Sequence, residues 1–540
     1  MNHLLCGLAA NPALPAPLTD RLLTLALDAA EAGAEVEADP GPGRVSSRDL
    51  SEELIRALAD RAELSPAQVR ALSAYDEHTA IRLAYSGTLT AADVDPTAQP
   101  FTAIALFDEG RGLPEWARLL AAFPDPDVRW QLATYSGLPP DVSATLVGDP
   151  DVEVVTELAL WTADPEVAAG LARHPHAEVR RAVACNEAVP SAALAALITG
   201  DRLPPATSCL VCDSRDVPFT HDPNCPDPDC RLRAGAACDG SHASTVHETW
   251  ERAVRNPATP PEVAASLADA PSMLLRWALA ERSDLPQHVY ARLARDPEPG
   301  VREVVAGNPA IGEELVRTLA AEAGQEERRA LAHHPRLPLD VLVRLAGTTR
   351  IGPVLLPRIA SATPDELVEL AGSPHASVRM LVAERRDLPA GVRDALAEDP
   401  DAAVVKAVAP HPGLSEGQLR AMVARFGVQV HARVAANPDA PGTLLAELAG
   451  HEPPVRRALR EIAAHPNTTA EALLPCLADE RARCAAAAHP ALAVPVLVGL
   501  LDHTDEDLAG AAASNPSLPR PVMEELVGRY SEPGVTSPVS

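Results

Sequence analysis

A two-residue phrase, asparagine or histidine followed by proline, recurs along this chain at a fixed spacing. It occurs at Asn256-Pro257, Asn308-Pro309, His334-Pro335, His411-Pro412, Asn437-Pro438, His465-Pro466, His489-Pro490 and Asn515-Pro516. The step from Pro309 to Pro335 is 26 residues, and two further pairs of copies repeat it. A Val-Arg pair recurs with the same period: Arg302, Arg379 and Arg456 are spaced 77 residues apart, which is about three repeats of 26. Two markers in phase predict a tandem-repeat architecture.

Each repeat contains the pattern of a short helical hairpin. After Pro338, which can open a helix, the apolar residues at 341, 342, 345 and 346 fall on one helical face. A second apolar stripe lies between Asp296-Pro297 and Asn308-Pro309. One such pair buries too little surface to be stable alone, so neighbours must stack. With 46% hydrophobic but only 3% aromatic residues, the chain suits thin helical layers. The sequence therefore predicts an all-α fold, an α-solenoid of ~26-residue helical repeats.

The period breaks once, in the middle of the chain. Arg180 and Arg302 are 122 residues apart, where three periods would need about 78, so about 44 residues are extra. The surplus coincides with a cluster of five cysteines between Leu203 and Val246. We therefore expect a solenoid over residues 1–203, a cysteine-rich insert over 204–246, a second stretch of solenoid over 247–529 and a disordered tail over 530–540.

The inserted cysteines have the spacing of metal ligands. They are Cys209, Cys212, Cys225, Cys230 and Cys238. A Cys-x2-Cys pair lets two thiolates of one turn reach the same ion, and a second pair can complete a tetrahedral set. The first four are the preferred ligands and Cys238 is the alternative. Both zinc and an iron-sulfur cluster remain open, because each needs four ligands.

The repeat text resembles the leucine-rich repeat variant family. The resemblance is carried by VREVVAGNPAIG, LAHHPRLPLDVLVRLAG and ARVAANPDAPGTLLAELAG. It implies units that pair an α-helix with a 3₁₀ helix in a superhelix. The family's founding example is similar in carrying a cysteine-bound four-iron four-sulfur cluster, but in an N-terminal domain, whereas these cysteines lie mid-chain. The repeats also resemble HEAT repeats, which we rank second because HEAT units are longer than 26 residues.

A separate resemblance, to an iron-sulfur motif, involves the last cysteine of the insert. Cys238-Asp239-Gly240-Ser241-His242 is similar to the core of the iron-sulfur motif named after those five residue types. That motif also requires a Cys-x-Cys pair upstream, where this chain has Asp227 and Asp229. The full motif is therefore absent, and His242 is only an optional ligand.

Composition narrows the function. A net charge of -29 and the lack of a basic run argue against nucleic acid, and no apolar stretch is long enough to span a membrane. The cysteine distribution is unlike a disulfide framework, which favours the cytoplasm. Lys406 is the only lysine, so there is no P-loop, and the nucleophile-elbow, zincin and dinucleotide-binding motifs are also missing. We therefore expect that the protein is not an enzyme.

The recurring polar residues have structural interpretations. The histidines before proline, among them His174, alternate with asparagine, so we expect them to close the end of a short helix. The Val-Arg arginines, Arg129, Arg180, Arg302, Arg379 and Arg456, should pair with an acidic residue of a neighbouring turn.

These observations predict a non-enzymatic scaffold that binds protein partners along the solenoid surface, with a metal-stabilised insert. The alternative is an iron-sulfur protein that carries electrons or senses oxidants while its solenoid docks a partner. The sequence fixes neither the partner nor the oligomeric state.

Overall fold

The computed structural model describes residues 2–34, 47–213, 238 and 240–531. Over these residues the fold is all-α, as predicted, with 35 α-helices, two 3₁₀ turns and one isolated β-bridge. Contacts divide the chain into two compact units, one formed by residues 95–361 and the other by residues 1–94 together with 362–540.

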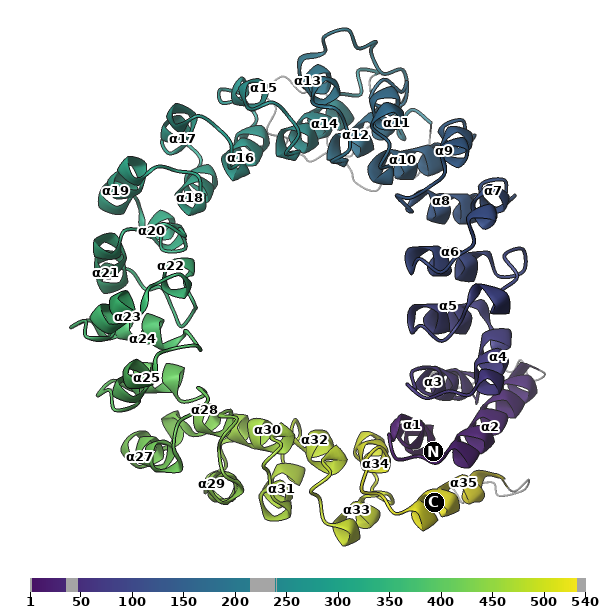
Figure 1. The fold of residues 1–540 in the computed structure, drawn as a ribbon, viewed down its shortest axis with the longest axis vertical. Helices are drawn as coiled ribbons and strands as arrows, with labels where there is room; N and C mark the ends of the chain where they lie inside the picture. Colours follow the sequence, from purple (N-terminus) through teal and green to yellow (C-terminus); the bar gives the residue numbers. More distant parts are fainter. Residues whose placement is uncertain (1, 35–46, 214–237, 239, 532–540) are drawn as a thin grey trace. The chain divides into compact units, whose positions relative to one another are not determined.

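The unit of residues 95–361 contains two layers of helices (Figure 1). Its helices are α6 (Pro100–Asp108), α7 (Pro114–Ala121), α8 (Pro126–Ala133), α9 (Pro140–Val147), α10 (Val152–Trp161), α11 (Pro165–Leu171), α12 (Ala177–Cys185), α13 (Ser191–Thr199), α14 (Ala243–Arg255), α15 (Pro261–Ala265), α16 (Met273–Glu281), α17 (Gln287–Leu293), α18 (Pro299–Gly307), α19 (Glu313–Glu322), α20 (Gln325–Leu331), α21 (Leu339–Thr348) and α22 (Pro357–Ala360). The even-numbered helices from α6 to α20 each contact the next in one layer. The contact of α12 with α14 carries this layer past the insert.

The other unit joins the two ends of the chain. Its C-terminal part contains α23 (Pro364–Ala371), α24 (Ala376–Ala383), α25 (Ala390–Ala397), α26 (Ala402–Val408), α27 (Glu416–Phe426), η2 (Gly427–Gln429), α28 (His431–Ala435), α29 (Gly442–Ala449), α30 (Arg456–Ala464), α31 (Ala470–Leu477), α32 (Arg483–Ala488), α33 (Val494–Leu500), α34 (Glu506–Ala513) and α35 (Arg520–Ser531). Its N-terminal part contains α1 (Asn2–Ala10), α2 (Ala16–Ala34), α3 (Ser47–Ala59), α4 (Pro66–Tyr75), α5 (Glu77–Tyr85) and η1 (Ala91–Asp93). One layer runs in contact order from α24 through the even-numbered helices to α34, and then to α1, α3 and α5.

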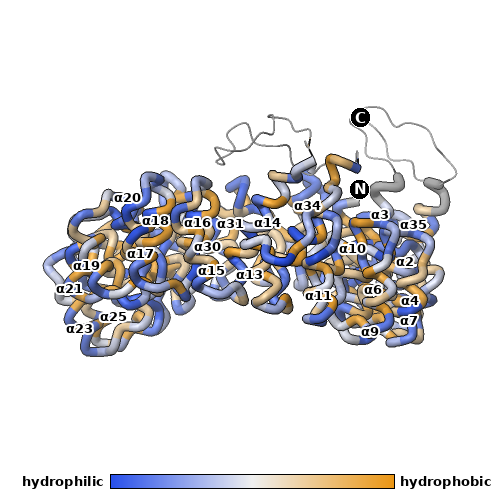
Figure 2. The backbone as a smooth tube through the Cα atoms, turned by 90° about the horizontal axis from the view of Figure 1, so that it is seen from above, coloured by the Kyte–Doolittle hydropathy of each residue, from blue (hydrophilic) through white to orange (hydrophobic). Residues whose placement is uncertain are grey.

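Local sequence explains why the helices are short. Many begin at a proline or after a capping aspartate; Asp401, for example, accepts a hydrogen bond from the backbone N–H of Ala403 at the start of α26. The same helix buries Val404, Val405 and Val408. Apolar and polar stretches alternate along the coloured part of the tube, as Figure 2 shows. Each helix is therefore a small amphipathic element that needs neighbours on its apolar face.

The recurring asparagines link successive repeats by hydrogen bonds. We call such a residue, whose side chain donates to backbone carbonyls of the preceding repeat, a rung. The Nδ2 of Asn437 donates to the carbonyls of Ala409 at 2.6 Å and His411 at 2.7 Å, in the preceding repeat. Its Oδ1 accepts from the backbone N–H of Asp439 at 2.9 Å, which closes the turn after its own helix. We expected only this local role. The contact with the preceding repeat follows from burial, because Asn437 is fully buried and all its polar atoms need partners.

Other residue types occupy the same position. Nε2 of His411 and of His465 contacts a carbonyl 28 residues earlier, at 2.7 and 2.8 Å. Arg282, which has no following proline, reaches the carbonyls of Val254 and Asn256 with one guanidinium nitrogen. Asparagine, histidine and arginine are interchangeable here because each presents an N–H donor at the required reach.

The first and last repeats are joined by a rung of the same kind. Asn11 donates through Nδ2 to the carbonyls of Ala513 at 2.9 Å and Asn515 at 2.7 Å. Helix α1 packs on α34, where Gly7 and Gly510 meet so closely that a Cβ on Gly510 would lie 2.7 Å from the carbonyl oxygen of His3. Thus α1 stands where the repeat after α34 would stand.

Most of the Val-Arg arginines have acidic partners. Arg129 forms a bidentate ion pair with Asp149, and Arg379 forms one with Asp399. In both pairs the aspartate side chain is buried and lies twenty residues later in the sequence, as predicted. The remaining three differ from one another. Arg302 pairs with Glu327 at 3.1 Å, Arg180 bonds to backbone carbonyls, and Arg456 is 80% exposed with its only described carboxylate contact at 4.0 Å.

The element boundaries near the insert and the tail differ slightly from those expected. Helix α14 begins at Ala243, inside the span assigned to the insert, and α35 continues to Ser531. The rest of the predicted tail lies outside the described residues.

Candidate metal centre

The two ends of the cysteine-rich insert meet at one point between α12 and α14. Cys209 and Cys212 follow α13, in a segment tied to the start of α12. Backbone bonds run from Thr207 to the carbonyl of Pro175 at 2.8 Å and from Ala177 to the carbonyl of Ser208 at 2.9 Å. The other end brings Cys238 and then His242, which is the N-cap residue of α14.

Four potential ligand atoms gather here. The Sγ atoms of Cys209 and Cys212 are 3.6 Å apart. Nδ1 of His242 lies 3.7 Å from the Sγ of Cys212 and 3.4 Å from that of Cys238. All four ligand atoms are within 4.8 Å of one another, so the cluster could hold a metal ion.

The turn from Cys238 to His242 depends on unusual backbone angles. Gly240 has a φ of +91° and His242 a φ of +55°, both in the left-handed region. This turn points the backbone N–H of Gly240 at the Sγ of Cys238, 3.4 Å away. The same turn folds the imidazole of His242 back onto the cysteine.

Burial and hydrogen bonding give the thiols different acidities. Burial raises the pKa of Cys209 to about 12, and the thiols of Cys212 and Cys238 add to the rise. Burial also acts on Cys238, but the backbone N–H groups of Gly240 and His242, together with the thiols of Cys212 and Cys209, outweigh it and lower the pKa of this thiol. Three thiolates so close together would repel one another. A cation between them removes that repulsion, which is why metal binding and loss of the thiol protons go together.

Residues around the cluster hold the Cys-x2-Cys turn in place. Asp213 donates its backbone N–H to the carbonyl of Cys209 at 3.0 Å. Its carboxylate lies 3.1 Å from Nε2 of buried His176, at the start of α12, and accepts a bond from the hydroxyl of Ser208. The first pair of candidate ligands is therefore anchored to the repeat that precedes the insert.

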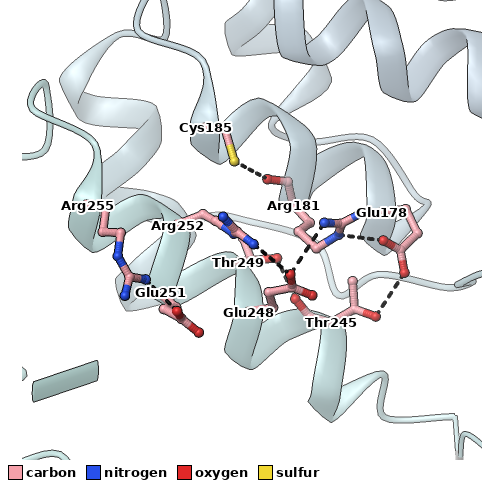
Figure 3. Close-up of polar contacts among 9 residues, drawn as sticks. All are labelled: Glu178, Arg181, Cys185, Thr245, Glu248, Thr249, Glu251, Arg252 and Arg255. Carbon is pink, nitrogen blue, oxygen red and sulfur yellow. Dashed lines mark hydrogen bonds and ion pairs between the residues drawn. The ribbon is translucent and has the colours of Figure 1, made fainter. Parts of the chain in front are cut away.

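The other two candidate ligands, Cys238 and His242, are held in place through α14. This helix packs on α12 through a row of polar side chains, which we call the polar seam (Figure 3). Buried Glu178 of α12 accepts a bond from the hydroxyl of Thr245 at 3.1 Å and pairs with Arg181 at 2.6 Å. Arg181 in turn reaches Glu248 of α14 at 3.4 Å. Because His242 is the N-cap residue of α14, this seam also fixes the imidazole relative to α12.

The structure brings together only part of the predicted ligand set. Cys209, Cys212 and Cys238 lie in the cluster, whereas Cys225 and Cys230 fall outside the described residues. His242, an optional ligand in the sequence analysis, stands beside all three. The signal for it was the Cys-x3-His spacing, which puts both side chains at one turn. Cys185 and Cys476 lie within α12 and α31, away from this site.

No protein-family model matches the sequence, and no curated protein is significantly similar to it. Among the described helices, none is both long and apolar enough to cross a membrane.

Proposed function

We propose that this chain is a non-enzymatic scaffold for protein partners, in which one zinc ion ties together the two ends of the cysteine-rich insert. The observation that carries the metal half of the proposal is the gathering of Cys209, Cys212, Cys238 and His242 within 4.8 Å. With four protein ligands such a zinc site is closed, which is typical of structural rather than catalytic zinc.

The ligand distances favour a single ion over a cluster. Zinc lies ~2.3 Å from sulfur and ~2.0 Å from nitrogen, so tetrahedral ligand atoms stand about 3.5 to 3.8 Å apart. Three of the distances within the cluster are 3.4 to 3.7 Å and match this spacing, and no two of the four ligand atoms are more than 4.8 Å apart. An iron-sulfur cluster spreads its ligands over two or more irons, so that some ligand atoms must be farther apart.

A metal at this position would join the two ends of the insert beside an unbroken stack of helices. Asn256, just after α14, donates to the carbonyls of Ala184 at 3.0 Å and Asn186 at 2.8 Å. These residues are 72 and 70 positions away, yet the bonds match those of repeats that are adjacent in sequence. The zinc would hold the two ends of the insert together, so that the repeats on either side stay in register.

Two exposed tryptophans support the partner-binding half of the proposal. Trp130 of α8 is 39% exposed and Trp161 of α10 is 48% exposed, on helices that contact each other. Tryptophan is enriched among the residues that dominate protein interfaces. In a chain with only five tryptophans, two exposed ones on adjacent helices mark a surface suited to a protein partner.

The metal half is tested by elemental analysis of the purified protein, comparing the wild type with Cys212→Ser and His242→Ala. We expect about one zinc per chain, lost in both variants, with little change in helix content. Cys484→Ser, a cysteine in α32, is the matched control and should keep the metal. A wild-type protein without metal, or variants that retain it, would contradict the proposal.

The partner-binding half needs its own test. Trp130→Ala and Trp161→Ala should weaken binding of a partner found by cross-linking. Trp277→Ala serves as the control, because Trp277 lies on α16, outside the proposed surface, and is only partly exposed. Equal binding by all three variants would count against this surface.

An iron-sulfur redox or oxidant-sensing protein is the second candidate. It is favoured by the five-residue core from Cys238 to His242 and by a donor set of three thiols and one imidazole. The same sample distinguishes it, because iron, acid-labile sulfide and a broad visible absorption band would replace the zinc.

A further inference from the structure

A groove of about 670 Å³ crosses three successive helices of one layer, α26, α28 and α30. Five cationic side chains line it: Lys406, Arg433, Arg456, Arg457 and Arg460. The only carboxylate in the lining is Glu461. We call this the basic groove. It contains the single lysine of a chain in which 75 acidic residues outnumber 46 basic ones.

The cations of the basic groove lack the partners that arginines have elsewhere. Within the described part of the chain, Arg456 has a carboxylate, Asp479, only at 4.0 Å, and no carboxylate lies within ion-pair distance of the other four. Half-buried Glu384 lies close enough to Arg433 to feel its charge, but burial still raises the pKa of this carboxyl. Nε of Arg460 is buried without a hydrogen-bond partner. Such a concentration of unpaired donors points to an anion supplied from outside.

The local sequence of α30 is unfavourable without such an anion. The helix opens with Arg456-Arg457, has no acidic residue in its first turn and has Val455 as an N-cap that makes no side-chain bond. Cations at the positive end of a helix are destabilising. By contrast, α34 of the same layer begins with a capping Asp505 followed by Glu506 and Asp507. A local rule broken at a charged groove is typical of a functional site.

We propose that the basic groove binds an acidic peptide segment of a protein partner. Its walls include Val428, which is 50% exposed, and Val455, so aliphatic side chains can pack between the charges. The lining contains no aromatic side chain on which the bases of a single-stranded nucleic acid could stack. A duplex would need an extended basic surface, which a net charge of -29 opposes. The choice of a peptide rests on the proposed scaffold function; the anion site itself rests on the charges.

The inference is tested on the full chain by fluorescence anisotropy with a labelled peptide of glutamate and leucine. We expect binding that weakens as salt rises, and a loss of at least about tenfold in the double variant Arg456→Glu, Arg457→Glu. The matched control is Arg344→Glu, Arg520→Glu, which makes the same charge change at exposed arginines outside the groove and should stay within about twofold of the wild type.

Each outcome decides one part of the inference. A phosphoserine peptide that binds more tightly, with the same loss in the variant, upholds the site and identifies the anion as phosphate. Tighter binding of an oligodeoxynucleotide, or of inorganic phosphate alone, overturns the peptide assignment. Equal losses in the groove and control variants, or no binding of any probe, overturn the site. Zinc content measured on the same samples stays independent of all these results, so a failure here is distinct from a failure of the metal-tied scaffold.

Discussion

The asparagine rungs offer the sharpest test of what holds the repeats together. Asn437→Ala removes two bonds to the carbonyls of Ala409 and His411 and a third to the N–H of Asp439. At about 1 kcal/mol for each bond, the loss is about 3 kcal/mol, since the orphaned groups stay buried. Asn437→His should cost only about 1 kcal/mol, because His465 shows that an imidazole supplies one donor and one acceptor at this position.

The measurement is urea-induced unfolding followed by circular dichroism, with free energies from the midpoints and a common slope. Asn467→Ala is the matched control. That asparagine also reaches carbonyls of the preceding repeat, but it is exposed and its bonds are 3.2 Å long, so its loss should cost at most about 0.5 kcal/mol. If Asn437→Ala were as mild as the control, or Asn437→His as harmful as alanine, the rungs would not be the source of stability.

Four further outcomes are expected. Burial lowers the pKa of His411, so this rung is neutral in the folded state; stability should fall as the pH drops below the ordinary histidine pKa of about 6.5, and less so in His411→Asn, as measured by urea midpoints at each pH. Gly510→Leu should push α1 off α34, seen as faster hydrogen exchange in α1 with α18 unchanged. Arg379→Met should cost about 3 kcal/mol in urea unfolding by leaving Asp399 buried and unpaired, with partial recovery in the double variant carrying Asp399→Asn. Removing metal with a chelator should speed proteolysis between α13 and α14 alone, as read by mass spectrometry.

The sequence predicted the all-α class and the faces on which individual helices are buried, because these depend on the spacing of apolar residues. Helix α21, for instance, buries Val341, Leu342, Leu345 and Ala346, the four positions named from the pattern. Such signals are local, so a short window of sequence contains them.

What the sequence did not reveal depends on contacts between distant segments. Arg282 could not be recognised as a rung, because it lacks the proline that marks the asparagines and only the three-dimensional stack brings Val254 within its reach. The ligand set posed the same difficulty. The Cys-x2-Cys pair was visible, but its meeting with His242 depends on the seam between α12 and α14. The basic groove was equally hidden, because Lys406, Arg433 and Arg456 come from three separate repeats.

The hydrogen bonds from Asn11 to the last repeat cannot form until late in the synthesis of the chain. One acceptor, the carbonyl of Ala513, lies 502 residues downstream. At roughly 5 to 20 residues per second, a ribosome needs about 25 to 100 s to make that acceptor after Asn11 has emerged. For that interval the apolar face of α1 that will meet α34 has no permanent partner, so a stalled or truncated chain leaves it open to chaperones and proteases.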